Sequence, residues 1–174
     1  MKKAEALIFD MDGTLYSFDK AQAGVFTASR FGQAIHNNCV QFFADRFALS
    51  ADQAERMYLD FKRRYNGEVS LGLEQEQGIP RTEYFSRTWD LDPAEFILPD
   101  EKLVQAIGLL TIQTGVLSAA PRVWVDRVLE FMQLRQIFEP AIFTGDPDIR
   151  KPHPQAFLQL AEWWQLDPST VVSM

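Results

Sequence analysis

Short apolar runs recur along the chain, and each is followed by a polar or turn residue. Runs of this length and composition, rich in β-branched and aromatic residues, are typical of buried strands. They lie at residues 6–10, 115–118, 141–144 and 171–174. We therefore expect strands at both ends of the chain and none of comparable strength over the long stretch in between.

Between the predicted strands at 115–118, 141–144 and 171–174, apolar residues recur with the spacing of a helix. A helix beginning at Pro121 would present one apolar face, made of Val125, Val128, Leu129 and Met132. A second helix, after a loop at 150–154, would present Phe157, Leu160, Ala161 and Trp164. Alternation of strands and helices predicts an α/β fold with a Rossmann-like parallel sheet and helices on both faces.

Residues 18–105 carry helical spacing with almost no strand-like alternation. One apolar face would contain Ile35, Cys39, Phe42, Phe43 and Phe47. Ser50 and Gln53 form a capping-box pattern, and the helix that it opens would present Ala54, Tyr58, Phe61 and Tyr65. We assign 1–17 and 106–174 to the α/β core and 18–105 to an all-helical insertion, which we expect to act as a lid over the carboxyl ends of the strands.

Composition narrows the class of protein. The chain has 174 residues, 47% of them hydrophobic and 24% charged, which is ordinary for a globular protein. Its net charge of −7 argues against a nucleic-acid-binding surface. The single cysteine, Cys39, excludes an intramolecular disulfide, and no apolar run is long enough to span a membrane. We therefore expect a cytoplasmic protein that does not act on membranes.

Residues with chemical potential follow the predicted strands. Asp10 and Asp12 end the first strand, Ser118 ends the second, and Lys151 lies in the loop after the third. In a parallel sheet these strand ends meet at one crevice. Gly13 lets the backbone come close to a bound anion there.

This set suits phosphoryl transfer through an aspartyl-phosphate. One carboxylate attacks, and a second donates and accepts the protons. The hydroxyl of Ser118, the backbone N–H groups of Met11 and Ala119, and the charge of Lys151 would hold the phosphoryl oxygens. Two acids beside a phosphate dianion repel it, so we expect Mg²⁺ as cofactor and a small phosphorylated molecule as substrate.

The same residues resemble the motifs of the haloacid dehalogenase-like hydrolases. The stretch Asp10-Met11-Asp12-Gly13-Thr14 resembles motif I, Leu117-Ser118 resembles motif II, and Lys151-Pro152-His153-Pro154 resembles motif III. The resemblance implies that Asp10 is the nucleophile and binds Mg²⁺ through its side chain. It implies that Asp12 is the general acid and base and offers Mg²⁺ its backbone carbonyl.

The helical insertion resembles a type 1 cap. Residues 64–67, 71–73 and 78–79 are most similar to the pyrimidine 5′-nucleotidase branch, which implies a phosphomonoester substrate such as a nucleoside monophosphate. That branch usually has Thr-Asn at motif II, where this chain has Ser118-Ala119. Contacts to the phosphate or the substrate would differ accordingly.

Motif IV of the family, a Gly-Asp with a further Asp, normally follows the strand that lies here at 171–174. The sequence stops at Met174, so we expect this chain to hold Mg²⁺ weakly and to be weakly active or inactive as a phosphatase. Asp146 and Asp148 are most simply solvated loop charges, and would be the substitute ligands if activity were high. We also expect an exposed apolar sheet edge that could pair with a second copy.

Three functions fit these patterns. The first is a Mg²⁺-dependent phosphatase, which the intact motifs I to III favour. The second is a non-catalytic relative that serves as a binding or regulatory module. The third is a phospho-acceptor domain of the receiver type, which the position of the acids on the first strand and the long insertion after it disfavour.

Overall fold

The computed structural model describes residues 3–17, 26–97 and 100–174, which belong to two compact units. Unit 1 comprises residues 1–23 and 92–174, and unit 2 comprises residues 24–91. Our predicted insertion extended to residue 105. By its contacts, however, the segment 92–105 groups with the sheet of unit 1. This segment contains the 3₁₀ helix η3 (Pro93–Glu95) and the first turns of α5 (Glu101–Gly108).

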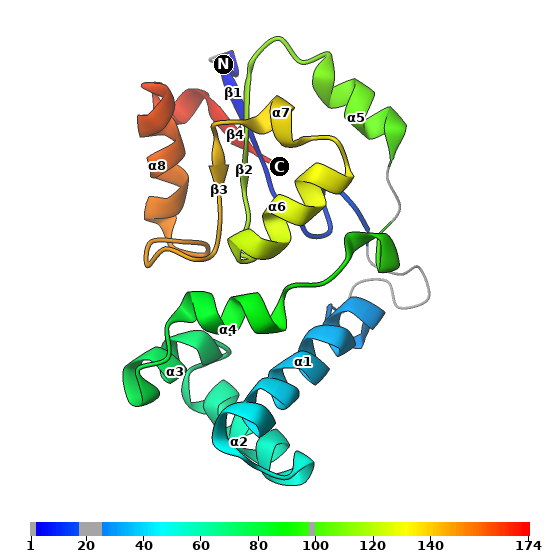
Figure 1. The fold of residues 1–174 in the computed structure, drawn as a ribbon. Coiled ribbons are helices and arrows are strands. Elements are labelled where there is room, and N and C mark those ends of the chain that lie inside the picture. Colours follow the sequence, from blue (N-terminus) through cyan, green and yellow to red (C-terminus); the bar gives the residue numbers. More distant parts are fainter. Residues whose placement is uncertain (1–2, 18–25, 98–99) are drawn as a thin grey trace. The chain divides into compact units, whose positions relative to one another are not determined.

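Within the described residues, unit 1 is built on a four-stranded parallel sheet in the order β3-β2-β1-β4 (Figure 1). Its central strand β1 (Ala6–Phe9) pairs with β2 (Gln113–Leu117) on one side and β4 (Val171–Ser173) on the other. The short strand β3 (Ile142–Phe143) pairs with β2. The predicted parallel sheet is thereby confirmed, and all strand ends of one kind lie along the same edge.

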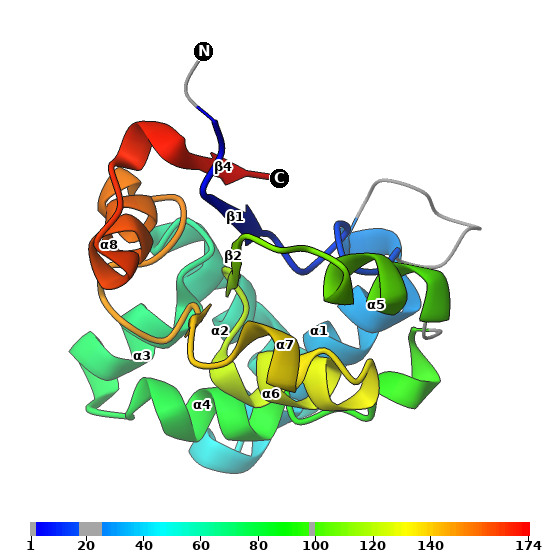
Figure 2. The same cartoon turned by 90° about the horizontal axis from the view of Figure 1, so that it is seen from above.

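Helices cover both faces of this sheet. Ile8 of β1 belongs to a core cluster with Leu160 of α8 (Pro154–Trp164). The next residue, Phe9, packs against Phe138 of α7 (Arg135–Phe138) with ring centroids 5.6 Å apart. Since neighbouring side chains of a strand point to opposite faces, α8 and α7 cover opposite faces. Figure 2 shows α8 on one side of the strands and α7, with α6 (Arg122–Phe131), on the other.

Unit 2 is helical throughout its described part. It contains η2 (Phe26–Ala28), α1 (Arg30–Phe47), α2 (Ala51–Arg64), α3 (Val69–Gln77) and α4 (Arg81–Thr88). Predicted apolar positions that are buried here are Ile35, Cys39, Phe42, Phe43, Ala54, Tyr58 and Phe61. The predicted capping box is present, because the Ser50 N–H donates to Gln53 Oε1 at 3.0 Å.

The residues that carry the resemblance to the nucleotidase branch lie at the end of α2, in α3 and just after it. Arg64 forms ion pairs with Asp60 and Glu76, and the Tyr65 hydroxyl donates to Glu76 Oε1 at 2.7 Å. A Cβ atom at Gly72 would lie 2.4 Å from the Tyr65 ring, so only glycine lets this ring pack there. These residues therefore have a structural role within unit 2, whatever the substrate is.

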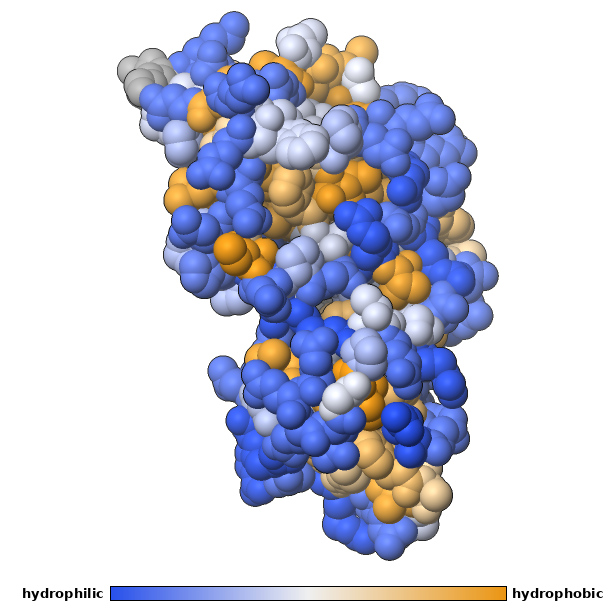
Figure 3. All heavy atoms as spheres, turned by 60° about the vertical axis from the view of Figure 1, so that its left-hand side comes forward, coloured by the Kyte–Doolittle hydropathy of each residue, from blue (hydrophilic) through white to orange (hydrophobic). Residues whose placement is uncertain are grey.

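The surface of unit 1 around α8 and β4 is partly apolar. Figure 3, with this side turned forward, shows hydrophobic residues gathered among hydrophilic ones. Trp163 of α8 is 56% exposed, and Val172 of β4 and Met174 beyond it are 44% and 60% exposed. Pairing of this edge with a second copy stays a prediction. No helix in the described ranges combines the length and the apolar character that a membrane span requires.

Cys39 gives a test of the packing of unit 2. Its thiol is 2% exposed and accepts a hydrogen bond from the Tyr84 hydroxyl at 3.0 Å, and burial raises its pKa to about 11. We expect Ellman's reagent at pH 8 to label the native chain at least about 100-fold more slowly than the urea-unfolded chain, because labelling requires the core to open. Cys39→Ala supplies the background rate. Equal rates in the two states would show that this core is not packed as described.

Candidate functional site

The turn after β1 presents Asp10 at the carboxyl edge of the sheet. The Asp10 N–H donates to the carbonyl of Met174 at 3.1 Å, so the backbone of Asp10 is hydrogen-bonded to the residue that follows β4. The Met11 N–H donates to Asp10 Oδ1 at 2.8 Å, which orients the carboxylate. The Asp10 side chain is 36% exposed and can be reached by a solute.

Gly13 shapes the same turn. Its φ of +84° lies in the left-handed region, which costs a residue with a Cβ about 1–2 kcal/mol. An added Cβ would meet no atom within 4 Å, so the backbone conformation, and not crowding, explains the glycine. The turn closes where the Thr14 and Leu15 N–H groups donate to the carbonyl of Met11.

Lys151 is brought to Asp10 from the loop before α8. Its Nζ lies 2.9 Å from Asp10 Oδ1, and its side chain is 19% exposed. The amino group thus neutralises the carboxylate at the point where an anionic substrate would arrive. Prediction from the sequence had placed both residues at one crevice, and the structure places them in contact.

Asp12 points into a buried polar network. Its Oδ1 accepts hydrogen bonds from the Tyr16 hydroxyl and, at 3.2 Å, from Trp124 Nε1. Its Oδ2 accepts from the Ser118 hydroxyl at 3.3 Å. Trp124 and Ser118 are 0% exposed, so the carboxyl of Asp12 is fixed by donors that water does not reach.

The network shifts the pKa values of the Asp12 carboxyl and the Tyr16 hydroxyl. Burial raises the pKa of Asp12, the hydrogen bonds from Tyr16 and Trp124 lower it, and the nearby charge of Asp10 raises it again; the net direction is upward. Burial, followed by the charge of Asp12, also raises the pKa of Tyr16, which therefore stays a hydroxyl donor. A carboxyl that takes up a proton more readily than usual suits a general acid.

The loops after β2 and β3 are fastened to each other. Ser118 Oγ accepts from the Ala120 N–H at 3.0 Å, and the Gly145 N–H donates to the Ala120 carbonyl at 2.8 Å. A Cβ at Gly145 would lie 1.9 Å from the carbonyl oxygen of Ala119, so the two backbones require a glycine here. Ala119 itself is exposed, and the contact of its N–H with phosphate stays a prediction, as does that of Met11.

Asp146 does not behave as the solvated charge that we expected. Its Oδ2 accepts from the Arg122 N–H at 2.6 Å and from the Thr144 hydroxyl at 2.6 Å. It therefore caps the first turn of α6, which makes it a poor substitute metal ligand. Asp148 is exposed in the same loop, and His153 caps α8 by accepting from the Gln155 N–H at 3.1 Å.

The donor set of the site fits a magnesium ion held mainly by water and substrate. The described residues contain no group of three or more His, Cys, Asp or Glu side chains that could hold a metal. Asp10 supplies one accessible carboxylate, and the Asp12 backbone carbonyl is the second protein oxygen that we expect. Mg²⁺ prefers such oxygen ligands and is commonly bound by one or two carboxylates with waters and phosphate oxygens.

Sequence reasoning missed Tyr16 and Trp124. Trp124 lies one helical turn before Val128 on the inner face of α6, and this spacing was the only signal for its burial. Its hydrogen bond to Asp12 depends on where α6 lies against the turn after β1, which no local pattern reports. Tyr16 follows the motif directly, and its hydroxyl turns back to Asp12 from four residues along the chain.

Solved structures share this fold. A HAD phosphatase from Thermococcus onnurineus matches with a TM-score of 0.61 and 18% identity, over 99% of this chain and 76% of that one. A protein from Clostridium acetobutylicum, described as a predicted phosphatase, matches with a TM-score of 0.59 and 15% identity over 99% and 76% of the two chains. Among curated proteins there is no significant match.

The family model of the haloacid dehalogenase-like hydrolases matches residues 4–172, which include β1, the site and α8. This match excludes the receiver-type alternative and agrees with the acids, the hydroxyl and the lysine at the carboxyl edge of the sheet. The chain therefore belongs to the haloacid dehalogenase-like hydrolases.

Proposed function

We propose that the chain is a Mg²⁺-dependent phosphomonoester hydrolase that works through an aspartyl-phosphate on Asp10. The observation that carries this proposal is the arrangement at the end of β1. There an accessible carboxylate is paired with Lys151 at 2.9 Å, and a second, buried carboxyl follows two residues later. Family membership supports a hydrolase, and the fold shared with phosphatases agrees with a phosphate ester as substrate.

Asp10 is the nucleophile of the proposed reaction. A carboxylate acts as a nucleophile without a base to activate it. Attack on phosphorus forms the Asp10–phosphate bond and releases the alcohol oxygen of the substrate. Lys151 passes from its ion pair with Asp10 to the phosphoryl oxygens and balances their charge.

Asp12 moves the protons. In its protonated form it gives a proton to the departing alcohol, and as a carboxylate it takes one from the water that hydrolyses the acyl phosphate. Tyr16 and Trp124 hold Oδ1 during both steps, while Ser118 lies at Oδ2. Oδ2, which has one donor where Oδ1 has two, is the oxygen through which the proton is exchanged in this proposal.

The bound magnesium ion would neutralise charge on the phosphoryl group and orient it for in-line attack. Asp10 and the Asp12 carbonyl would hold the ion, as argued above. Assays with a panel of nucleoside monophosphates and sugar phosphates would identify which phosphomonoester is the substrate. We propose a nucleoside monophosphate first, on the resemblance of residues 64–67 to the nucleotidase branch.

Replacement of the nucleophile tests the proposal. We expect Asp10→Asn to lower kcat/KM for p-nitrophenyl phosphate by at least about 10³-fold, the size typical for loss of a nucleophile. EDTA should abolish phosphate release by the wild-type chain, and Mg²⁺ should restore it. Phosphate release is measured with a colorimetric assay.

Glu130→Gln is the matched control, since it removes an exposed acid from α6 and should leave the rate unchanged. Activity that survives Asp10→Asn would refute the covalent mechanism. Binding of a phosphomonoester without turnover by the wild-type chain would favour the non-catalytic alternative instead.

The burial of the Asp12 carboxyl leads to a second prediction, which concerns the stability of the protein. Because folding raises the pKa of Asp12, ionisation of this carboxyl lowers the free energy of unfolding. The loss of stability is absent at pH values below the pKa of the unfolded chain and is complete above the pKa of the folded chain. Asp12→Asn keeps an oxygen for Tyr16 and Trp124 and offers an amide to Ser118. In metal-free buffer it should raise stability at pH 7 by about 1 kcal/mol, as relief of a strained functional site often does.

Thermal unfolding at several pH values measures this effect. The gain should disappear below about pH 4, where the wild-type carboxyl is protonated in both states. Glu74→Gln, which removes an exposed acid of α3, should show no such gain. A variant that is less stable than wild type at pH 7, or a gain that persists at low pH, would contradict the prediction.

A further inference from the structure

Unit 2 contains a cavity whose wall residues have no assigned role in the proposed hydrolysis. It has a volume of about 350 Å³ and lies between η2, the first half of α1 and the end of α2. All of its wall residues belong to unit 2. At the ~30 Å³ that each molecule has in liquid water, this space corresponds to a ligand of about ten non-hydrogen atoms.

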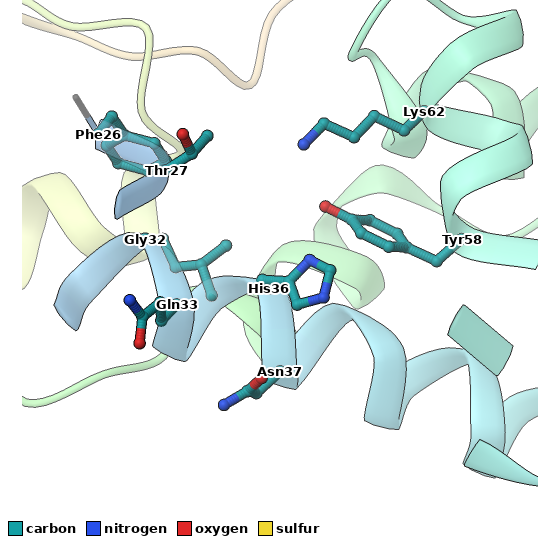
Figure 4. Close-up of a pocket in the computed structure, with 9 residues that line it drawn as sticks. Phe26, Thr27, Gly32, Gln33, His36, Asn37, Tyr58 and Lys62 are labelled. Atoms are coloured by element: carbon teal, nitrogen blue, oxygen red, sulfur yellow. The ribbon is translucent and has the colours of Figure 1, made fainter. Parts of the chain in front are cut away.

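One positive charge is directed into this cavity. Figure 4 shows the Lys62 amino group pointing into the space that faces Phe26 and Thr27, with the Tyr58 hydroxyl beside it. The amides of Gln33 and Asn37 point away from the same space. The polar groups at the cavity are thus the Lys62 ammonium group, hydroxyl groups and the His36 imidazole. The ammonium and hydroxyl groups can donate hydrogen bonds.

The charge of Lys62 is not balanced within the described part of the chain. Its neighbours in α2, Arg63 and Arg64, both form ion pairs with Asp60. Lys62 has no carboxylate within 4.0 Å among the described residues, and its nearest aromatic contact is the Tyr58 ring at 5.9 Å. In a chain of net charge −7, an unpaired ammonium group that faces a cavity is a site for an anion.

Glu55 is the acid to consider on α2, because it precedes Tyr58 by three positions and Lys62 by seven and so shares their helix face. It lies 3.3 Å from His36 Nε2, and His36 is a wall residue whose ring contacts Tyr58 edge-on. The carboxylate is therefore engaged with the imidazole and leaves Lys62 as the group that attracts charge. The acid of α2 is thus paired with His36, whereas the Lys62 ammonium group has no ion-pair partner among the described residues.

The remaining wall is apolar. Phe26 is 36% exposed although one of its contacts is a stacked Trp89 ring, with centroids 6.3 Å apart. Ile35, which is 6% exposed, adds aliphatic surface beside it. A partly exposed aromatic side chain next to a charged group suits a ligand with an aromatic body and an anionic head.

We propose that this cavity binds a small aromatic monoanion, with its carboxylate or phosphate-type head at Lys62 and its ring on Phe26 and Ile35. The Thr27 hydroxyl donates to the head. All wall residues of the cavity belong to unit 2, and binding to it is measured without any turnover.

Binding is measured on the full ¹⁵N-labelled chain by NMR titration in metal-free buffer. The probes are benzoate and phenylphosphonate, which share the aromatic anion and separate the two kinds of head; neither is hydrolysed. We expect a Kd of about 1 mM for at least one of them, a usual affinity for ligands of this size. Amide shifts should centre on Gly32, His36 and Lys62.

Matched variants of one helix decide whether Lys62 carries the binding. Lys62→Met should weaken binding at least about 10-fold, and Lys62→Arg should restore most of it. Arg63→Met removes the same charge from the next position, where the side chain is 80% exposed, and should leave the Kd unchanged. Circular dichroism checks that each variant is folded.

The remaining outcomes each bear on the proposal. Acetate, which has a head without a ring, should bind too weakly to saturate, and so should benzyl alcohol, which has a ring without charge. Equal affinity for acetate and benzoate would overturn the apolar half of the site. Equal weakening by Arg63→Met, no shifts in unit 2, or shifts confined to residues around Asp10 and Lys151 would overturn the proposal, while leaving the proposed hydrolysis untouched.

Discussion

The parallel pairing of β1 with both of its neighbours is the constraint on which the site depends. Because β2 and β4 run in the same direction as β1, their carboxyl ends reach the same edge of the sheet. Asp10 and Ser118 therefore arrive at that edge without any special loop. Reversal or slippage of one strand would carry its functional residue to the far edge or the opposite face.

A buried carboxyl is the main energetic burden of this arrangement. Asp12 is taken out of water, and its three donors replace only part of the lost hydration, as the upward direction of its pKa indicates. Asp10, two residues earlier, is solvated and paired with Lys151. Two carboxylates of one turn thus have different environments, which is what separate roles as nucleophile and proton carrier require.

The sequence was sufficient for those parts of the fold and site that depend on local pattern. Strand ends identified Asp10, Asp12, Ser118 and Lys151, and parallel order explained why they meet. The local sequence pattern could not predict contacts that depend on how helices pack against the sheet. Trp124 reaches Asp12 only because α6 lies across the end of β1, and Asp146 is fixed by a helix start distant in sequence. The domain boundary was displaced for the same reason, since residues 92–105 are grouped by contacts and not by composition.

Trp124 has two roles at once. Its ring is wholly buried on the inner face of α6, and its Nε1 is a donor to Asp12. A substitution that improves the packing of the ring but displaces the nitrogen would stabilise the protein and weaken its chemistry together. If the proposed reaction takes place, the packing of the core and the chemistry at Asp12 both depend on this one side chain, so fewer substitutions of Trp124 would satisfy both.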